Sequence, residues 1–208
     1  FLRSKKDSRL RVVSPSTKMS MSEHWDFAQK FAVGDWQMFL GQDDLLMRGY
    51  AEAFDSLVSI ATKSRVNAIV ARRAYVCWPP LRNKNLRPLQ YWDTNEVEIR
   101  ESKNFVSQAL LSEISYHSGP QMYTSSLISR ELISTIRVSQ KGRLINGHPQ
   151  DAYLAASILK NSRGFLWTGK PFSWVGTSDK SAGLAVINRN KNGGSDGLAN
   201  SYLSSVVS

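Results

Sequence analysis

The sequence predicts a mainly α fold, a helical bundle with a small β-element and flexible extensions at both ends. Three observations support this prediction. Apolar residues recur with the helical period of about 3.6 in several long segments. A single short segment near 95–101 alternates apolar and charged residues, as a half-buried strand does. Both ends of the 208-residue chain are polar, which leaves the apolar residues to the middle.

These observations divide the chain into one globular domain and two tails. Residues 1–19 form a basic N-terminal arm, in which six cations accompany Asp7. Residues 20–180 form the helical core domain, and a hydrophobic content of 41% is enough for a packed interior. Residues 181–208 form a polar C-terminal tail, because "NRNKNGGSDGLAN" has the glycine and polar content of a linker.

Three predicted helices occupy the first part of the core. The first lies around "EHWDFAQKF". The second is "DDLLMRGYAEAFDSLVSIA", where Asp43 or Asp44 can cap the first turn. The third is "SRVNAIVARRAYVCW", with Ser64 as a plausible N-cap and Pro79-Pro80 as the stop signal.

A strand and three further helices complete the predicted core. "NEVEIRESK" alternates apolar and charged residues and predicts a short strand. Helical periodicity returns in "SKNFVSQALLSEISYHSG", "TSSLISRELISTIRV" and "HPQDAYLAASILK". Gly119-Pro120 ends the first of these, and Pro149 suits the first turn of the last. The core therefore contains five or six helices and at most one small strand pair.

The segment "RGFLWTGKPFSWVGTS", residues 163–178, follows the last helix and is unusually aromatic. Glycine and proline divide it into turns. We expect Phe165 and Trp167 to fold back as a lid on the bundle. Phe172 and Trp174 lie beyond the Gly169–Pro171 turn, where we expect no core of their own chain. We therefore predict that these two side chains dock on a neighbouring subunit in a homo-oligomer.

The charge distribution carries the functional information in the sequence. The chain has 27 basic and 17 acidic residues, a net charge of +10. Residues 23–55 hold seven acids and two cations, whereas residues 63–92 hold seven cations and no acid. A helical surface is the simplest explanation of the acidic block. A charge of this size favours a polyanionic partner.

The acid-free stretch predicts a nucleic-acid interface, with RNA favoured over DNA. Cations attract phosphates, and bases stack on aromatic faces such as that of Trp78, with Tyr75 and Trp92 as further candidates. The alternative is a solvated basic face that the acidic block neutralises, within the chain or across a subunit contact. The cations predicted to neutralise the phosphate backbone are Arg65, Arg72, Arg73, Arg82, Lys84 and Arg87.

The order of several short strings resembles one protein family. "VARRAYVCWPP" is followed by "EVEIRES", "FVSQALLSEIS", "SSLISRELISTIR" and an aromatic end, "GFLWTG". Over residues 24–170 this order is similar to that of the coat proteins of rod-shaped plant RNA viruses. The resemblance implies a helical bundle whose subunits stack around a genomic RNA. It also implies that Arg65, Arg72, Arg73 and Arg130 lie near that RNA. The arm and the tail extend beyond the family pattern.

Two other classes of function compete with a coat or nucleocapsid subunit. Asp93 followed by Glu101 and Lys103 resembles the acid and E-x-K set of PD-(D/E)xK nucleases, in which carboxylates hold Mg²⁺. The small amount of predicted sheet argues against that core. The other class is a scaffold subunit of a ribosome-like or other large complex, where the basic face would meet acidic proteins.

The remaining sequence features argue against a membrane span, a cofactor site and an enzymatic motif. No run of apolar residues is long enough for a membrane span, so we expect no membrane partner. The three histidines are far apart, no phosphate-binding glycine motif occurs, and we expect no enzymatic activity and no cofactor. Cys77 is the single cysteine, which fits a reducing compartment, either the cytoplasm or a virion.

Overall fold

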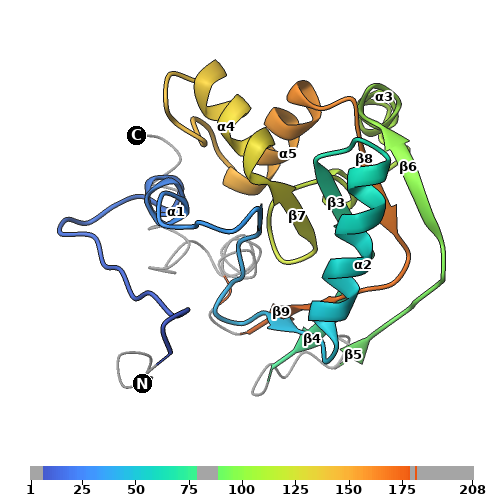
Figure 1. Cartoon of the computed structure of the whole chain (residues 1–208), viewed down its shortest axis with the longest axis horizontal. Coiled ribbons are helices and arrows are strands. Elements are labelled where there is room, and N and C mark those ends of the chain that lie inside the picture. Colours follow the sequence, from blue (N-terminus) through green and yellow to red (C-terminus); the bar gives the residue numbers. More distant parts are fainter. Residues whose placement is uncertain (1–6, 79–88, 179–180, 182–208) are drawn as a thin grey trace, which may run out of the picture.

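The computed structural model describes residues 7–78, 89–178 and 181, and it shows an α/β fold with two mixed sheets (Figure 1). The predicted helical bundle is therefore wrong. The bundle that the resemblance to rod-shaped coat proteins implied is likewise not the fold of this chain. The error lies in two segments, 66–77 and 163–178, which form the central strands of both sheets.

The larger sheet has five strands in the order β1-β7-β3-β8-β6. β3 and β8 are parallel, and the other neighbours are antiparallel. β6 lies at one edge and β1 at the other. The strands are β1 (Trp36–Gln37), β3 (Ala68–Ala71), β6 (Val97–Glu101), β7 (Ser126–Ser129) and β8 (Gly164–Thr168).

The smaller sheet has four strands in the order β2-β9-β4-β5. Its central pair, β4 and β9, is again parallel. β4 follows β3 after only Arg72 and Arg73, and β9 follows β8 after residues 169–172. The same two chain segments therefore run side by side through both sheets. The strands are β2 (Leu45–Leu46), β4 (Ala74–Cys77), β5 (Leu89–Gln90) and β9 (Ser173–Thr177).

Helices cover both faces of the five-stranded sheet. α2 packs on one face, where Leu57 and Ala61 meet Ile69 and Leu166. α3, α4 and α5 cover the other face, and α1 adds Trp25 to that cluster (Figure 1). The helices are α1 (Met21–Gln29), α2 (Tyr50–Lys63), α3 (Ser102–Leu110), α4 (Arg130–Ser139) and α5 (Gln150–Asn161), and Tyr116–Ser118 form a short 3₁₀ turn, η2.

β3 shows why the segment 66–77 misled the helical interpretation. Its four residues are all buried, since Ala68 and Val70 face the α3–α5 side while Ile69 and Ala71 face α2. A strand buried on both faces has no apolar–polar alternation. Its continuous apolar run therefore also fits one face of a helix. Ser64, the predicted N-cap of this segment, is instead the C-cap of α2.

The aromatic segment 163–178 forms β8 and β9 rather than turns and a lid. Phe165 and Trp167 point from β8 into the α3–α5 side of the core. Phe172 is 2% exposed and packs edge-on against Phe54, with ring centroids 4.8 Å apart. Its own chain buries Phe172, so the expectation that it docks on another subunit is wrong. Trp174 is half-buried beside Tyr91, and a docking role for it stays a prediction.

Several predicted elements are confirmed. The strand near 95–101 is β6, but its apolar residues Val97 and Ile99 are exposed rather than buried on one face. Helices form at 21–29, 102–110 and 150–161. "TSSLISRELISTIRV" divides into β7 and α4 at Ser129, whose side chain caps the helix by accepting from the backbone N–H of Leu132. No helix or strand occurs within 7–18 of the predicted arm. The predicted tail lies almost wholly outside the described residues. Among the described helices, none combines the length and apolar character needed to cross a bilayer.

Candidate anion-binding site

A basic pocket of about 400 Å³ opens where the parallel strands β3 and β8 end. Arg72 and Arg73 follow β3 directly, and Trp167 is the penultimate residue of β8. β6 contributes Arg100, and the turn around η2 contributes His117 and two serines. In open α/β sheets ligands bind outside the carboxyl ends of the strands, and this pocket has that position. Its lining consists of Ala71, Arg72, Arg73, Tyr75, Arg100, Ser115, His117, Ser118 and Trp167.

Arg72 and Arg73 are held at the change from one sheet to the other. The backbone N–H of Arg72 donates to the carbonyl of Thr168 at 2.8 Å, which joins the two parallel strands. The Arg73 guanidinium donates to the side-chain carbonyl of the fully buried Gln121. The Nε–H groups of Arg72 and Arg73 are buried and have no acceptor among the described residues. Both Nε atoms are closed to solvent, so they do not donate into the open pocket in this arrangement.

Trp167 organises the arginines. The Arg100 guanidinium carbon lies 4.0 Å from the centroid of the Trp167 ring, and that of Arg72 lies 5.5 Å away. Both distances are typical of cation–π contacts. Arg100 also pairs with Glu98 at 2.7 Å, so its charge is partly neutralised at the outer rim. Because arginines cover the indole face, Trp167 orients cations and is not open for base stacking.

His117 is fixed as a neutral hydrogen-bond acceptor. Its Nδ1 lies 3.3 Å from an Arg73 nitrogen and 3.4 Å from the side-chain nitrogen of Gln121, both of which are donors. Nδ1 must therefore be unprotonated in this arrangement. Loss of hydration and the positive charge of Arg73 lower the pKa of His117, and the negative charge of Asp151 opposes them. None of the nine residues that line the pocket carries a carboxylate.

Of the other predicted nucleic-acid residues, Tyr75 also lines the pocket, whereas the remaining ones lie elsewhere or outside the described part of the chain. Trp78 donates its indole N–H to the Asp43 carbonyl at 2.6 Å, five residues beyond Arg73. Five residues of strand span about 16 Å, so Trp78 does not belong to the pocket. Arg82, Lys84 and Arg87 lie outside the described residues.

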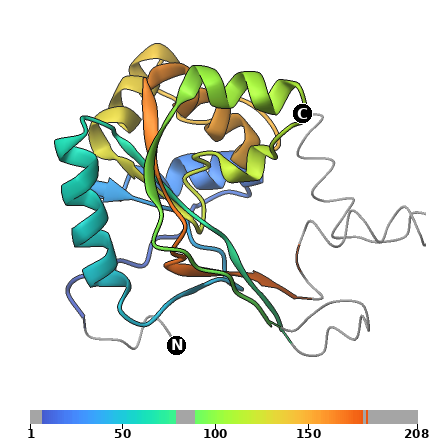
Figure 2. The same ribbon diagram turned by 90° about the vertical axis from the view of Figure 1, so that its right-hand side faces the viewer.

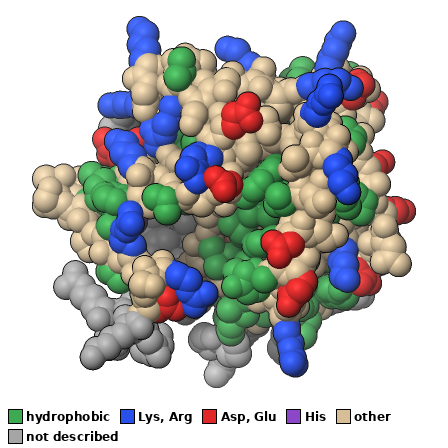
Figure 3. Space-filling model, in the orientation of Figure 1, with side chains coloured by type: hydrophobic (Ala, Val, Ile, Leu, Met, Phe, Trp, Pro, Cys, Tyr) green, Lys and Arg blue, Asp and Glu red, His purple; other side chains and the backbone are tan. Residues whose placement is uncertain are grey.

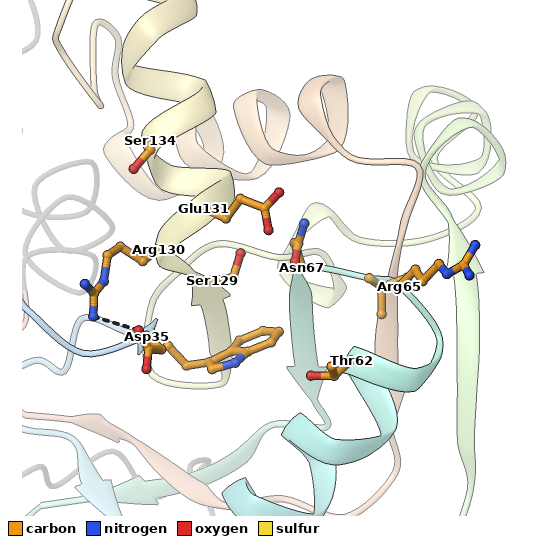
Figure 4. A pocket seen from close by; sticks show the side chains of 10 residues that line it. Asp35, Thr62, Arg65, Asn67, Ser129, Arg130, Glu131 and Ser134 are labelled. Atoms are coloured by element: carbon orange, nitrogen blue, oxygen red, sulfur yellow. Dashed lines mark hydrogen bonds and ion pairs between the residues drawn. The ribbon is translucent and has the colours of Figure 1, made fainter.

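Arg65 and Arg130 line a second pocket, of about 690 Å³, at the opposite end of β3 (Figure 4). Figure 4 shows the Arg65 side chain extending away from Asp35 and Thr62, while Arg130 forms an ion pair with Asp35 at 2.7 Å. Glu131 adds a second carboxylate to the lining. This mixture of charges does not favour an anion, so the structure separates Arg65 and Arg130 from Arg72 and Arg73.

The residues of the nuclease alternative do not assemble into a metal site. Asp93 accepts from the Tyr91 hydroxyl at 3.0 Å, and Glu101 is an exposed residue bonded to Asn104. Within the described part of the chain, no group of three or more His, Cys, Asp or Glu side chains could hold a metal ion. The geometry therefore lends the PD-(D/E)xK interpretation no support.

The sequence predicted only two of the basic residues that line the pocket as binding residues. Arg72 and Arg73 stood out in the acid-free stretch, whereas Arg100 was assigned only to a strand and His117 to a helix end. The sequence places Trp167 in a predicted lid. These residues lie together because β3, β8 and β6 are neighbouring strands of the sheet, although they are distant in the sequence.

Comparison with known proteins does not identify a function for the pocket. The sequence matches no protein-family model and no curated protein.

Proposed function

We propose that this protein binds nucleic acid, with RNA favoured, through phosphate contacts at the basic pocket, and that it serves as a packaging subunit of a multi-subunit assembly. The observation that carries this proposal is the convergence of Arg72, Arg73 and Arg100 on one concave site that lacks a carboxylate. The net charge of +10 agrees with a polyanionic partner.

Arginine suits this task because its planar guanidinium presents several donors that match phosphate oxygens. Arg72 and Arg73 are half-buried residues of the pocket lining, so their guanidinium groups can donate to a phosphate held there. Ser115 and Ser118 add hydroxyl donors at the rim.

The pocket favours backbone recognition over base readout. A volume of about 400 Å³ lies at the lower end of the range for ligand pockets and suits a phosphate with part of its sugar. Trp167 is covered by arginines and Trp78 is distant, which leaves the half-buried Tyr75 as a predicted stacking residue in the lining. Contacts with phosphates position a nucleic acid without reading its sequence. We therefore propose binding that is largely independent of sequence.

The salt dependence of RNA binding tests this proposal. Replacing Arg72 and Arg73 together by alanine should weaken binding of a single-stranded RNA and make it less dependent on salt. The slope of log K against log salt should fall in magnitude by about 1.4, because each phosphate contact with a single strand contributes roughly 0.7. Fluorescence anisotropy at several salt concentrations measures this slope.

Arg65→Ala is the matched control for this measurement. Arg65 is an exposed arginine on the same chain segment, but it lies at the other end of β3. Its removal should leave the slope within about 0.7 of the wild-type value. Equal losses for the control and the double variant would show that binding follows total charge rather than the pocket. An unchanged slope in the double variant would contradict the proposal.

His117 provides an independent test through its titration. In the free protein we expect a pKa of His117 below the ordinary value of 6.5, because of lost hydration and Arg73. An anion held beside the ring favours the protonated form, so saturation with a short RNA should raise this pKa. NMR titration of the imidazole signals measures both values.

The same pKa shift fixes the direction of a stability change. Between the lowered pKa of folded His117 and the value near 6.5 of the unfolded chain, the unfolded state binds more protons. The contribution of His117 to stability is therefore present above pH 6.5 and is lost as the pH falls through the lower pKa. In His117→Gln this part of the pH dependence should disappear, and its persistence would exclude His117 as the cause.

A further inference from the structure

Within the described part of the chain, no strand pairs with the outer edge of β6 in the five-stranded sheet. β6 pairs with β8 on one side only and is the last strand of the sheet. In Figure 2, β6 and the following helix α3 face the viewer. Val97 and Ile99 are 43% and 45% exposed, so apolar side chains stand beside unpaired backbone. Proteins normally cover or disrupt such an edge, because it is a template for another strand.

The hydrogen bonds to β8 show which backbone groups of β6 point outward. The carbonyl of Glu96 accepts from Gly169, and the N–H of Ser102 donates to Arg163, at the two ends of the strand. Inward and outward groups alternate along an antiparallel strand. Residues 98 and 100 therefore bond to β8, and residues 97, 99 and 101 direct their N–H and C=O groups away from the sheet.

The sequence of β6 is complementary to itself when it is read in the opposite direction. In Val97–Glu101, a two-fold axis through Ile99 places Glu98 of one copy opposite Arg100 of the other. The outward groups of residues 97, 99 and 101 then form the hydrogen-bonded pairs of the new ladder. Glu98 and Arg100 fall at the non-hydrogen-bonded positions, where opposite side chains are closest and opposite charges are favourable. The outward backbone groups and the charged side chains therefore favour the same antiparallel register, centred on Ile99.

Apolar contact would accompany this pairing on the other face of the sheet. Val97 and Ile99 lie on the α2 side, since Ile99 is paired with Leu166 of the α2-facing cluster. Figure 3 shows apolar side chains gathered over the centre and right of the face that carries α2. The two-fold axis places Ile99 of the two copies next to each other, so both are removed from water together.

We propose that a second copy of this chain binds along β6, antiparallel and centred on Ile99, so that the two five-stranded sheets become one continuous sheet. The two-fold axis is perpendicular to the sheet, and the basic pockets of both copies then open on the same face. This interface does not depend on nucleic acid. The dimer forms with protein freed of RNA, which keeps its test separate from that of the proposed function.

Charge reversal tests the register. Glu98→Arg and Arg100→Glu each place like charges opposite one another twice per dimer, and we expect each to weaken the homodimer roughly 10- to 30-fold. Mixing the two variants restores opposite charges in a heterodimer, which should form about as tightly as the wild-type dimer. Sedimentation equilibrium on nuclease-treated protein, with one variant fluorescently labelled, measures homodimer and heterodimer separately.

Ile99→Pro tests the backbone ladder. The Ile99 N–H points outward, so proline removes a donor of the proposed ladder while the bonds to β8 remain. Ile99→Thr is the matched control, because it keeps the N–H while reducing the apolar surface. We expect proline to abolish dimers and threonine to weaken them only severalfold, with circular dichroism spectra unchanged. A monomeric wild type at every concentration, a dimer that survives Ile99→Pro, or variants that do not restore each other would overturn the proposal.

Discussion

Replacing Asp44 by alanine is expected to lower the free energy of unfolding by about 3–5 kcal/mol. Asp44 is 5% exposed, and its carboxylate accepts hydrogen bonds from Gly41 N and Gly176 N at 2.8 Å and from the Thr124 hydroxyl at 2.6 Å. The three donors belong to segments that are distant in sequence. Alanine would leave the buried Thr124 hydroxyl and two half-buried backbone N–H groups without this acceptor, and each buried group costs about 1–3 kcal/mol.

Chemical denaturation measures this loss, and the neighbouring Asp43 supplies the control. The Asp43 side chain accepts from the Ser181 hydroxyl at 2.6 Å and is only half-buried, while its bond with Trp78 uses the backbone carbonyl. Asp43→Ala should therefore lower stability by about 1 kcal/mol or less. Equal losses for the two variants would show that the Asp44 carboxylate is not the anchor of this region.

The acidic block 23–55 illustrates what the sequence could not reveal. It was interpreted as a solvated helical surface, yet Asp26 and Asp44 are both buried. Asp26 accepts from the backbone of Leu144 at 2.7 Å and pairs with Arg137 at 3.1 Å, which joins α1 to α4. A carboxylate with distant partners looks the same in sequence as an exposed one. The composition therefore shows how many acidic residues this block holds but not which of them are buried and connect distant segments.

Local patterns predicted the elements whose burial is one-sided. α3 and α5 each bury one face, so their apolar period is visible in the sequence. β6 also shows its alternation of apolar and charged residues, although four of its five residues are exposed. β3 and β8 are buried on both faces and have no such pattern. The sequence thus identified the periphery of the sheets and mistook their centre for helix and loop.

The candidate site was predictable to the same partial extent. Arg72 and Arg73 were recognised because a run without acids is a local property. Arg100, His117 and Trp167 reach them only through the pairing of β3 with β8 and of β8 with β6, together with the packing of η2. The spacing of these residues in the sequence does not show that they converge on one pocket.

Replacing Trp167 by alanine should lower the free energy of unfolding by about 3–5 kcal/mol and also weaken RNA binding roughly tenfold. Trp167 is 7% exposed, and the guanidinium groups of Arg72 and Arg100 lie over its ring. Without the indole, both arginines lose the surface that holds them toward the pocket. Trp167→Phe keeps an aromatic face and should retain most of the affinity.

Phe165→Ala separates the two effects of the Trp167 change. Phe165 is fully buried, lies two residues earlier on β8, and packs into the same side of the core, but it does not line the pocket. Its truncation should cost a similar 3–5 kcal/mol or so of stability. RNA affinity, measured at a temperature where both variants are folded, should fall only for Trp167→Ala. Equal loss of affinity in both would mean that the indole merely supports the fold, whereas a loss confined to Trp167→Ala assigns it to the orientation of the arginines.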